Sequence, residues 1–478
     1  MPPAGAPILA PVVTQYNMKL QLGCLAASLT ACLVLCQAAT PDDNLRVRTQ
    51  TGVFTGLVNE QYSNVREFRT IPFAQPPIGS RRWLPPQPLG PSGQHFYSYR
   101  WPSVCPQFAR KNESLWSNNI TDFSPMTYGQ SLLAGTMMQS SSEDCLYLAI
   151  WTPRNVSADS KLPVAIFIPG GSFINGGVSI NYQVPASFIS THNDVIVVSM
   201  NYRLNIFGFP KAAGLEDQNL GMLDNRAAVE WIYNNIGAFG GDQERMILWG
   251  HSAGAVAVDI YNYAYYDSPL IKGLFLMSGT AAVPPPPEDP KFSNFTFVAK
   301  AVGCDFPDDP AAELGCMRQV PAGLLTNILG DYAANGTKPR LNFQGVKDDK
   351  VYYGNYTTRA AKGLLAKIPA IISTTANEQS SLAEYPLRNL TDGPWQEAVT
   401  NGTINTFVCP ALNTTAWRSR HGLNTYRYQF AGTISALTPL AWMGEFLLST
   451  AIVFRHTYPA ASRRLPRRRR TYGHGLVP

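Results

Sequence analysis

The sequence predicts an α/β fold in which one doubly wound, mostly parallel sheet is flanked by helices. Short apolar runs typical of buried strands occur at 162–168, 194–200, 245–249, 272–277 and 368–374. They alternate with helical stretches such as 224–236, and this alternation favours a single doubly wound sheet. A chain of 478 residues has room for several average domains, but one large α/β sheet also reaches this size.

The most informative motif follows the strand at 245–249 and reads Gly250-His251-Ser252-Ala253-Gly254. A G-x-S-x-G sequence after a buried strand is typical of a nucleophile elbow, a strained strand-to-helix turn that requires small residues two before and two after the serine. Gly250 and Gly254 meet that requirement. The motif also arises by chance, so it is a weak signal without support from the rest of the chain.

Support comes from the segment Pro169-Gly170-Gly171-Ser172-Phe173, which follows the strand at 162–168. Backbone with few side chains can turn its N–H groups toward a ligand, and such groups stabilise the negative charge that acyl transfer places on a carbonyl oxygen. The candidate oxyanion donors are the amides of Gly171, Ser172 and Ala253. The alternative for a Gly-Gly pair after a strand is an ordinary turn.

Several further motifs occur in the order typical of one family. They lie at 68–86, 143–153, 169–173, 219–224 and 239–242. Together with the elbow, they resemble the type B carboxylesterases, the cholinesterase-like esterases and lipases of the α/β-hydrolase fold. The resemblance implies a domain over 39–454 with loop insertions above the site, hydrolysis of a small-molecule or lipid ester, and a catalytic serine, acid and histidine in that chain order.

Glu378 is the acid that the resemblance implies, because Asn377-Glu378 follows the predicted strand at 368–374. Its role would be to orient the histidine and to stabilise the imidazolium that forms when the serine loses its proton. The alternative is a solvated loop carboxylate.

The histidine position departs from the family pattern. The segment 442–446 resembles the approach to the catalytic histidine, but the next residue is Leu447, which cannot accept a proton. His456, nine residues later, is the tentative general base. Two hypotheses therefore stand: a secreted serine esterase, or a catalytically impaired relative that has a binding role or is a truncated gene product.

The C-terminal tail, 455–478, lacks both family character and apolar periodicity. Six arginines between Arg463 and Arg470 equal the whole formal charge of +6, so the charge does not guide the choice of substrate. A basic cluster is sometimes a nucleic-acid or membrane-surface patch, but we expect a solvated end and no nucleic-acid partner. The abrupt change also resembles a mis-predicted exon or a shifted reading frame.

The N-terminal segment, 1–38, has the pattern of a secretory signal. Lys19 precedes an apolar stretch at 20–36, which small and then polar residues follow. We expect cleavage after Ala38, with Met18 as the true start. A membrane anchor is the alternative; no other segment has the length and apolarity to span a membrane.

Glycosylation motifs and cysteines fit secretion. Nine Asn-x-Ser/Thr acceptors occur, at Asn112, Asn119, Asn155, Asn294, Asn335, Asn355, Asn389, Asn401 and Asn413. The family resemblance implies disulfides Cys105–Cys145 and Cys304–Cys316 in an oxidising compartment. That leaves Cys409, which we expect as a buried small apolar residue.

No cofactor or metal site emerges, since the glycine-rich segments lack nucleotide-binding spacing and the histidines show no ligand pairing. Specialised cholinesterases carry a tryptophan shortly before the cysteine that matches Cys145, as a platform for the cationic choline group. The stretch 132–142 has none, so choline esters are not the expected substrates.

Overall fold

The computed structural model describes residues 43–108, 140–180, 183–284, 288–335, 341–383 and 392–432. The predicted signal segment 1–38, Leu447, His456 and the basic tail lie outside these residues, as do the acceptors Asn112, Asn119 and Asn389. The chain divides into two units, Met1–Asp43 and Asn44–Pro478, and the elements below belong to the second.

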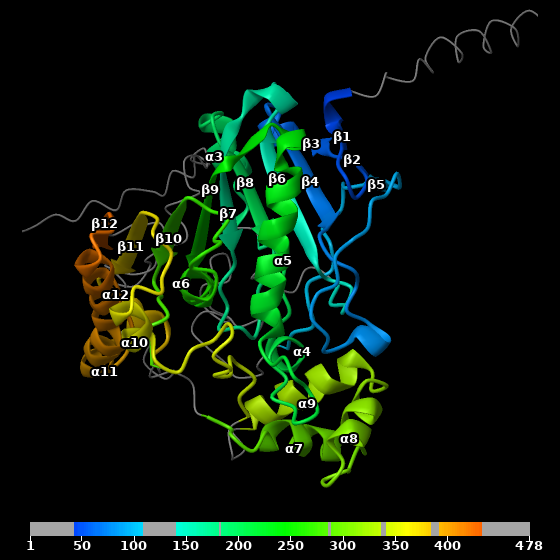
Figure 1. Ribbon diagram of the computed structural model, residues 1–478, viewed down its shortest axis with the longest axis vertical. Helices are drawn as coiled ribbons and strands as arrows, with labels where there is room; N and C mark the ends of the chain where they lie inside the picture. The colour runs from blue at the N-terminus through cyan, green and yellow to red at the C-terminus, as the bar shows by residue number, and fades with distance from the viewer. Residues whose placement is uncertain are drawn as a thin grey trace, which may run out of the picture. The chain divides into compact units, whose positions relative to one another are not determined.

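One large sheet organises the fold, and the order of its nine described strands is β12-β11-β10-β9-β7-β8-β6-β4-β3 (Figure 1). The strands are β3 (Leu57–Val58), β4 (Val65–Pro72), β6 (Tyr147–Pro153), β7 (Leu162–Ile168), β8 (Ile196–Met200), β9 (Gly241–His251), β10 (Gly273–Met277), β11 (Ala370–Thr375) and β12 (Thr425–Phe430). Pairing is parallel from β8 through β7, β9, β10 and β11 to β12, and antiparallel among β8, β6, β4 and β3. The predicted doubly wound, mostly parallel α/β-hydrolase sheet is therefore confirmed.

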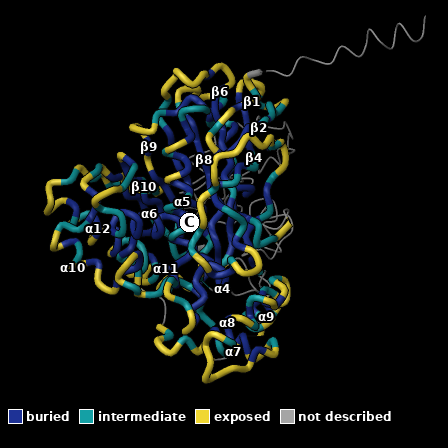
Figure 2. Tube along the Cα trace, turned by 45° about the vertical axis from the view of Figure 1, so that its right-hand side comes forward, coloured by how far each residue is buried: buried dark blue, intermediate teal, exposed yellow. Residues whose placement is uncertain are grey.

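Helices cover both faces of this sheet. The helices of the described residues are α3 (Ala186–Thr191), α4 (Asn205–Gly208), α5 (Leu220–Asn235), α6 (Ala253–Ala264), α7 (Ser293–Ala301), α8 (Pro310–Met317), α9 (Ala322–Ala334), α10 (Tyr356–Ala361), α11 (Gln396–Gly402) and α12 (Cys409–Arg420). Residues of α5, α6, α10 and α12 share one hydrophobic core with Ile166, Val198 and Leu248 of the sheet. Residues of α3 pack with Phe167, Val197 and Trp249 on the other face. Figure 2 shows the central strands buried between these layers, as continuous apolar runs in a parallel sheet require.

Two smaller parts complete the described fold. Strands β1 (Arg46–Arg48), β2 (Val53–Thr55) and β5 (His95–Tyr97) form a separate three-stranded sheet. Helices α7, α8 and α9 lie together (Figure 1) around a second core that includes Phe295, Leu314 and Leu325. The disulfide Cys304–Cys316 joins the segment after α7 to α8.

Both predicted disulfides are present, Cys105–Cys145 and Cys304–Cys316. The expectation for Cys409 is wrong: this free cysteine is exposed, because it begins α12 on the outer side of that helix. Asn294 does not fit the surface position of a glycosylation acceptor either, since it is 7% exposed and its amide donates to the Asn342 carbonyl. The acceptors Asn155, Asn335, Asn355, Asn401 and Asn413 are exposed.

Glu313 in α8 gives the helical cluster a pH-dependent stability. The residue is 4% exposed, Oε1 accepts a hydrogen bond from Thr296, and Oε2 has no partner among the described residues. Burial, with a smaller contribution from Asp305, raises the pKa of the Glu313 carboxyl. Because the pKa of Glu313 is higher in the folded chain than in the unfolded chain, its ionisation opposes folding. The stabilisation associated with protonated Glu313 is therefore fully present below the unfolded-state pKa and is lost as pH rises through the folded-state pKa.

We expect Glu313→Gln to be more stable than the parent chain at about pH 7, with the difference disappearing near about pH 4, where Glu313 is largely protonated. Thermal unfolding at both pH values measures this. Glu397→Gln, at an exposed position on α11, is the matched control. A Glu313→Gln variant that is destabilised equally at both pH values would show that the ionised carboxylate does not oppose folding.

Candidate active site

Ser252 occupies the turn between β9 and α6, as the elbow motif predicts. Its backbone has φ 54° and ψ −122°, outside the regions that side-chain-bearing residues ordinarily adopt. Such strain costs of order 1–3 kcal/mol and persists only where the surroundings hold it. Here the Ser252 N–H donates to the Met277 carbonyl at 2.8 Å, and the Ser252 carbonyl accepts from Val256 N–H at 3.0 Å.

The glycines of the motif are required by close approach of backbone. A Cβ on Gly250 would lie 2.3 Å from the carbonyl carbon of Gly254, and one on Gly254 would lie 2.0 Å from the carbonyl oxygen of Ile168. A Cβ on Gly170 would lie 2.5 Å from the His251 carbonyl oxygen and 3.2 Å from the Ser252 Cβ. The segment after β7 therefore packs directly on the Ser252 turn. This packing brings together two predicted parts of the active site, the elbow and the segment with the candidate oxyanion donors.

We call this segment, 169–176, the oxyanion loop. The hydrogen bonds that hold it among the described residues do not use two of its candidate oxyanion donors. Gly171 has φ 124° and Ser172 has φ 57°. The Gln344 side chain donates to the Ser172 carbonyl at 2.9 Å, and the Tyr202 hydroxyl donates to the Pro169 carbonyl at 2.9 Å. Within the described residues, the N–H groups of Gly171 and Ser172 donate no hydrogen bond. They are available to a ligand oxygen.

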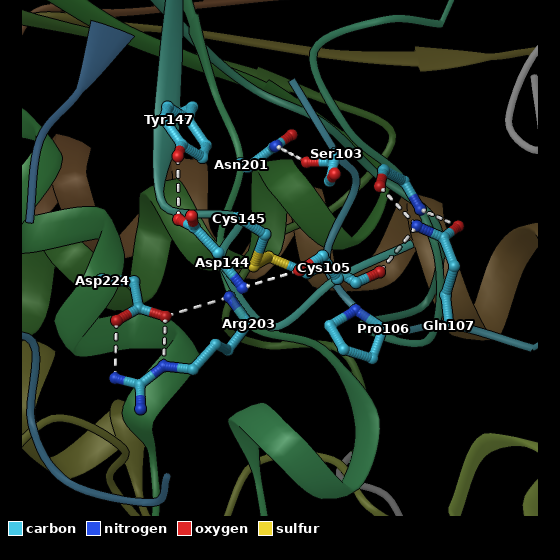
Figure 3. Close-up of a disulfide and its surroundings, with 12 residues drawn as sticks. Ser103, Cys105, Pro106, Gln107, Asp144, Cys145, Tyr147, Asn201, Arg203 and Asp224 are labelled. Atoms are coloured by element: carbon cyan, nitrogen blue, oxygen red, sulfur yellow. Dashed lines mark hydrogen bonds and ion pairs between the residues drawn. A yellow bond between two sulfur atoms is a disulfide. The ribbon is translucent and has the colours of Figure 1, made fainter. Parts of the chain in front are cut away.

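Gln107 clamps the far end of the oxyanion loop. Its side-chain amide donates to the Gly176 carbonyl at 3.1 Å, and its Oε1 accepts from the Gly176 N–H at 3.2 Å. Figure 3 shows that Gln107 lies two residues from Cys105, whose disulfide to Cys145 fixes this segment beside the sheet. Backbone N–H donors that are already held in position stabilise a developing oxyanion, because the protein does not have to rearrange during the reaction.

Glu378 follows β11 and lies at the same, carboxyl edge of the parallel strands. Its Oε1 accepts the Thr375 N–H at 2.7 Å, and the Ser278 side chain also bonds to the carboxylate. Burial raises the pKa of Glu378, and the hydrogen bonds from Thr375 and Ser278 oppose that rise. The carboxylate is therefore partly buried and held by hydrogen bonds rather than a solvated loop group.

The segment after β10, 278–281, was not foreseen from the sequence. Ser278 contacts Glu378, and its N–H donates to the Ser373 carbonyl at 2.9 Å. A Cβ on Gly279 would lie 2.5 Å from the Ser252 carbonyl oxygen, so the same segment also packs on the elbow. The signal available in the sequence was a Ser-Gly pair at the end of a predicted strand, between the strands that precede Ser252 and Glu378.

The described histidines do not supply an evident general base. His95 lies on the small sheet, while His192 and His421 lie in the turns before β8 and β12, at the amino edge of the parallel strands. His251 precedes Ser252, and burial lowers its pKa to about 4, so this imidazole is neutral at neutral pH. Leu447 and the tentative base His456 lie outside the described residues. The structure thus brings together Ser252, the oxyanion loop and Glu378.

A serine in a strained strand-to-helix turn, with a glycine-containing loop packed on it and a partly buried glutamate at the same carboxyl edge of a mostly parallel sheet, is typical of the α/β-hydrolase class. Residues 43–406 match the sequence pattern that describes the carboxylesterase family. The chain belongs to the carboxylesterase family and is a carboxylic ester hydrolase.

Named relatives agree with this assignment. The chain is 37% identical over 414 residues to a chlorogenic acid esterase of Aspergillus niger, a match that covers 85% of this chain and 77% of that protein. It is 34% identical over 431 residues to secreted lipase 5 of Gibberella zeae, covering 84% and 78%. Acetylcholinesterase of Bungarus fasciatus is 32% identical over 307 residues, covering 61% of this chain and 46% of that protein. In the described part of this chain, no helix has the length and apolarity to cross a bilayer.

Proposed function

We propose that this chain is a secreted serine hydrolase that cleaves carboxylic esters through an acyl-Ser252 intermediate. The observation that supports the proposal most strongly is the packing of the oxyanion loop on the strained Ser252 turn, where the Gly171 and Ser172 amides donate to no described residue. A serine hydroxyl and free N–H donors on adjoining backbone are the two parts that acyl transfer needs at one carbonyl group.

The reaction follows from these positions. Ser252 Oγ attacks the ester carbonyl and its proton passes to a general base, while the Gly171, Ser172 and Ala253 amides hold the oxygen that becomes negative. The base then protonates the leaving alcohol, the acyl group stays on Ser252, and water attacks this acyl-enzyme to release the acid. Glu378 would orient the base, for which His456 is the tentative candidate.

A second function is favoured by one observation, the leucine at 447 where the family carries its histidine. Without a base, the same fold would bind esters with little turnover, as a catalytically impaired relative or a truncated product. The hydrolysis of p-nitrophenyl butyrate by the parent chain and by Ser252→Ala distinguishes the two functions, because only an active serine hydrolase would lose turnover in the variant.

Secretion and glycosylation belong to the proposal. Relatives named as secreted lipases, the signal-like pattern at 1–38 and the exposed acceptor asparagines support export through a glycosylating, oxidising compartment. Digestion with an endoglycosidase, read as a loss of apparent mass in protein from the culture medium, tests it.

Uncharged short-chain and aryl esters are the proposed substrate class. The tryptophan that would stack on a choline cation is missing from 132–142, and a cation–π contact in a desolvated site is worth about 2 kcal/mol. We expect kcat/KM for p-nitrophenyl butyrate to exceed that for butyrylthiocholine by at least about tenfold. Both substrates deliver the same acyl group, so the comparison isolates the leaving group. A tenfold advantage for the choline ester would reverse the assignment.

A further inference from the structure

A buried polar network lies behind the candidate nucleophile. Helix α6 begins directly after Ser252, and two turns along it Asp259 is 1% exposed. Asn262, one turn further, and Arg418 of α12 are each 0% exposed. Burying a carboxylate, an amide and a guanidinium is costly unless each is paired, so their partners indicate what the network does.

Asp259 joins α6 to the segment 278–281. Its Oδ2 accepts the Ala281 N–H at 2.7 Å, and its Oδ1 accepts from Asn262 Nδ2 at 3.1 Å. Burial raises the pKa of the Asp259 carboxyl, and the hydrogen bond from the Ala281 N–H is the largest of the contacts that oppose that rise.

Arg418 extends the network to the strands on the acid side of the sheet. Its Nε donates to Thr425 Oγ1 at 3.0 Å at the start of β12, and its Nη2 donates to the Ile368 carbonyl shortly before β11. Its Nη1 lies 3.5 Å from Asn262 Oδ1, and Asn262 in turn donates to Asp259, so Arg418 is linked to Asp259 through Asn262. The helix that follows Ser252 and the strand that precedes Glu378 are therefore joined by one chain of hydrogen bonds, from Asp259 through Asn262 to Arg418.

The hydrogen bond from Ala281 to Asp259 matters because Ala281 belongs to the same short segment as Ser278 and Gly279. Ser278 bonds to Glu378, and Gly279 packs on the Ser252 carbonyl. The segment 278–281 thus touches both the candidate acid and the elbow, and Asp259 holds its end.

We propose that Asp259 is a positioning residue for ester hydrolysis: by accepting the Ala281 N–H it fixes Ser278 against Glu378 and Gly279 against Ser252, while Asn262, which Arg418 contacts, holds Asp259 in place. The proposal rests on the acyl-Ser252 mechanism. It concerns turnover more than substrate binding, because the acid and the elbow act on the transition state, and their displacement lowers kcat more than it changes KM.

Asp259→Asn is the test variant, because it keeps the shape and removes one acceptor. If the oxygen of the introduced amide accepts the Ala281 N–H, its NH₂ group meets the NH₂ group of Asn262, and two donors face each other. We expect kcat for p-nitrophenyl butyrate, per Ser252 titrated with a fluorophosphonate, to fall by about tenfold or more, with KM within about twofold of the parent value.

A double variant, Asp259→Asn with Asn262→Asp, provides the rescue. The amide introduced at position 259 then accepts the Ala281 N–H and donates to the carboxylate introduced at position 262. That carboxylate faces Arg418, so every hydrogen bond of the network can form again, and we expect the double variant to recover most of the lost kcat. Glu143→Gln is the structural control, since it breaks the buried Arg82–Glu143 ion pair and should lower the melting temperature without changing kcat.

The outcomes separate this inference from the proposed function. A parent labelled at Ser252 whose Asp259→Asn variant keeps its kcat, or falls no further than Glu143→Gln, would overturn the positioning role alone. A parent that is not labelled contradicts the acyl-Ser252 mechanism. In that case hydrogen exchange decides: faster exchange confined to 278–283 and 375–380 in Asp259→Asn supports the positioning role, and unchanged or uniformly faster exchange overturns it.

Discussion

In a chain whose general base is present or restored, replacing Ser252 with alanine is expected to abolish covalent labelling by a fluorophosphonate and to lower ester hydrolysis by at least about a thousandfold. Only the hydroxyl is lost, since alanine keeps the Cβ of serine and leaves the candidate oxyanion amides unchanged. What remains is the small acceleration that binding and oxyanion stabilisation supply without a nucleophile.

Mass spectrometry of labelled peptides, combined with p-nitrophenyl butyrate kinetics, measures both effects. Ser268→Ala, in the exposed turn after α6, is the matched control and should behave as the parent chain does. Equal labelling of Ser252→Ala and of the parent would remove Ser252 from the mechanism.

Restoring a histidine at position 447 is expected to raise esterase activity by at least about a hundredfold, in a chain given the C-terminus of a relative. If position 447 is the place of the base, the leucine there leaves Ser252 with no acceptor for its proton and Glu378 with no imidazole to orient. General-base catalysis alone is typically worth about two to four powers of ten, which is the size of the expected gain.

The matched control is Leu447→Gln, which makes the position polar without supplying a base. The rival base is His456. If the unaltered chain already hydrolyses p-nitrophenyl butyrate briskly and loses that activity in His456→Ala, the base is His456 and position 447 is not its place.

The fold was predictable because it depends on short-range patterns that survive in a single sequence. The strands at 162–168 and 368–374, predicted from apolar runs, correspond to β7 and β11. Crowding around a strained turn demands glycine at fixed offsets, so the elbow could be read from the sequence as well. The two disulfides came from the family resemblance rather than from spacing.

Contacts between residues that lie far apart in the sequence were not predictable. Nothing near Asp259 in the sequence indicates that its carboxylate accepts from Ala281 and is linked through Asn262 to Arg418, because these contacts depend on how α6, α12 and the segment after β10 pack. The exposure of Cys409 and the burial of Asn294 were missed for the same reason, since a residue's type does not say which side of its helix faces the core.

The crowding at the elbow affects how a mutational survey of this enzyme should be interpreted. Besides the motif's own Gly250 and Gly254, the turn needs Gly170 and Gly279, each of which would place a Cβ 2.5 Å from an elbow carbonyl oxygen. In a scan scored by activity, all four glycines would therefore rank with Ser252 as intolerant, although none exchanges a proton or bonds to substrate. Scoring the same library for protein abundance as well would separate the glycines from Ser252. A side chain that does not fit at a glycine position lowers the amount of folded protein, whereas Ser252→Ala does not.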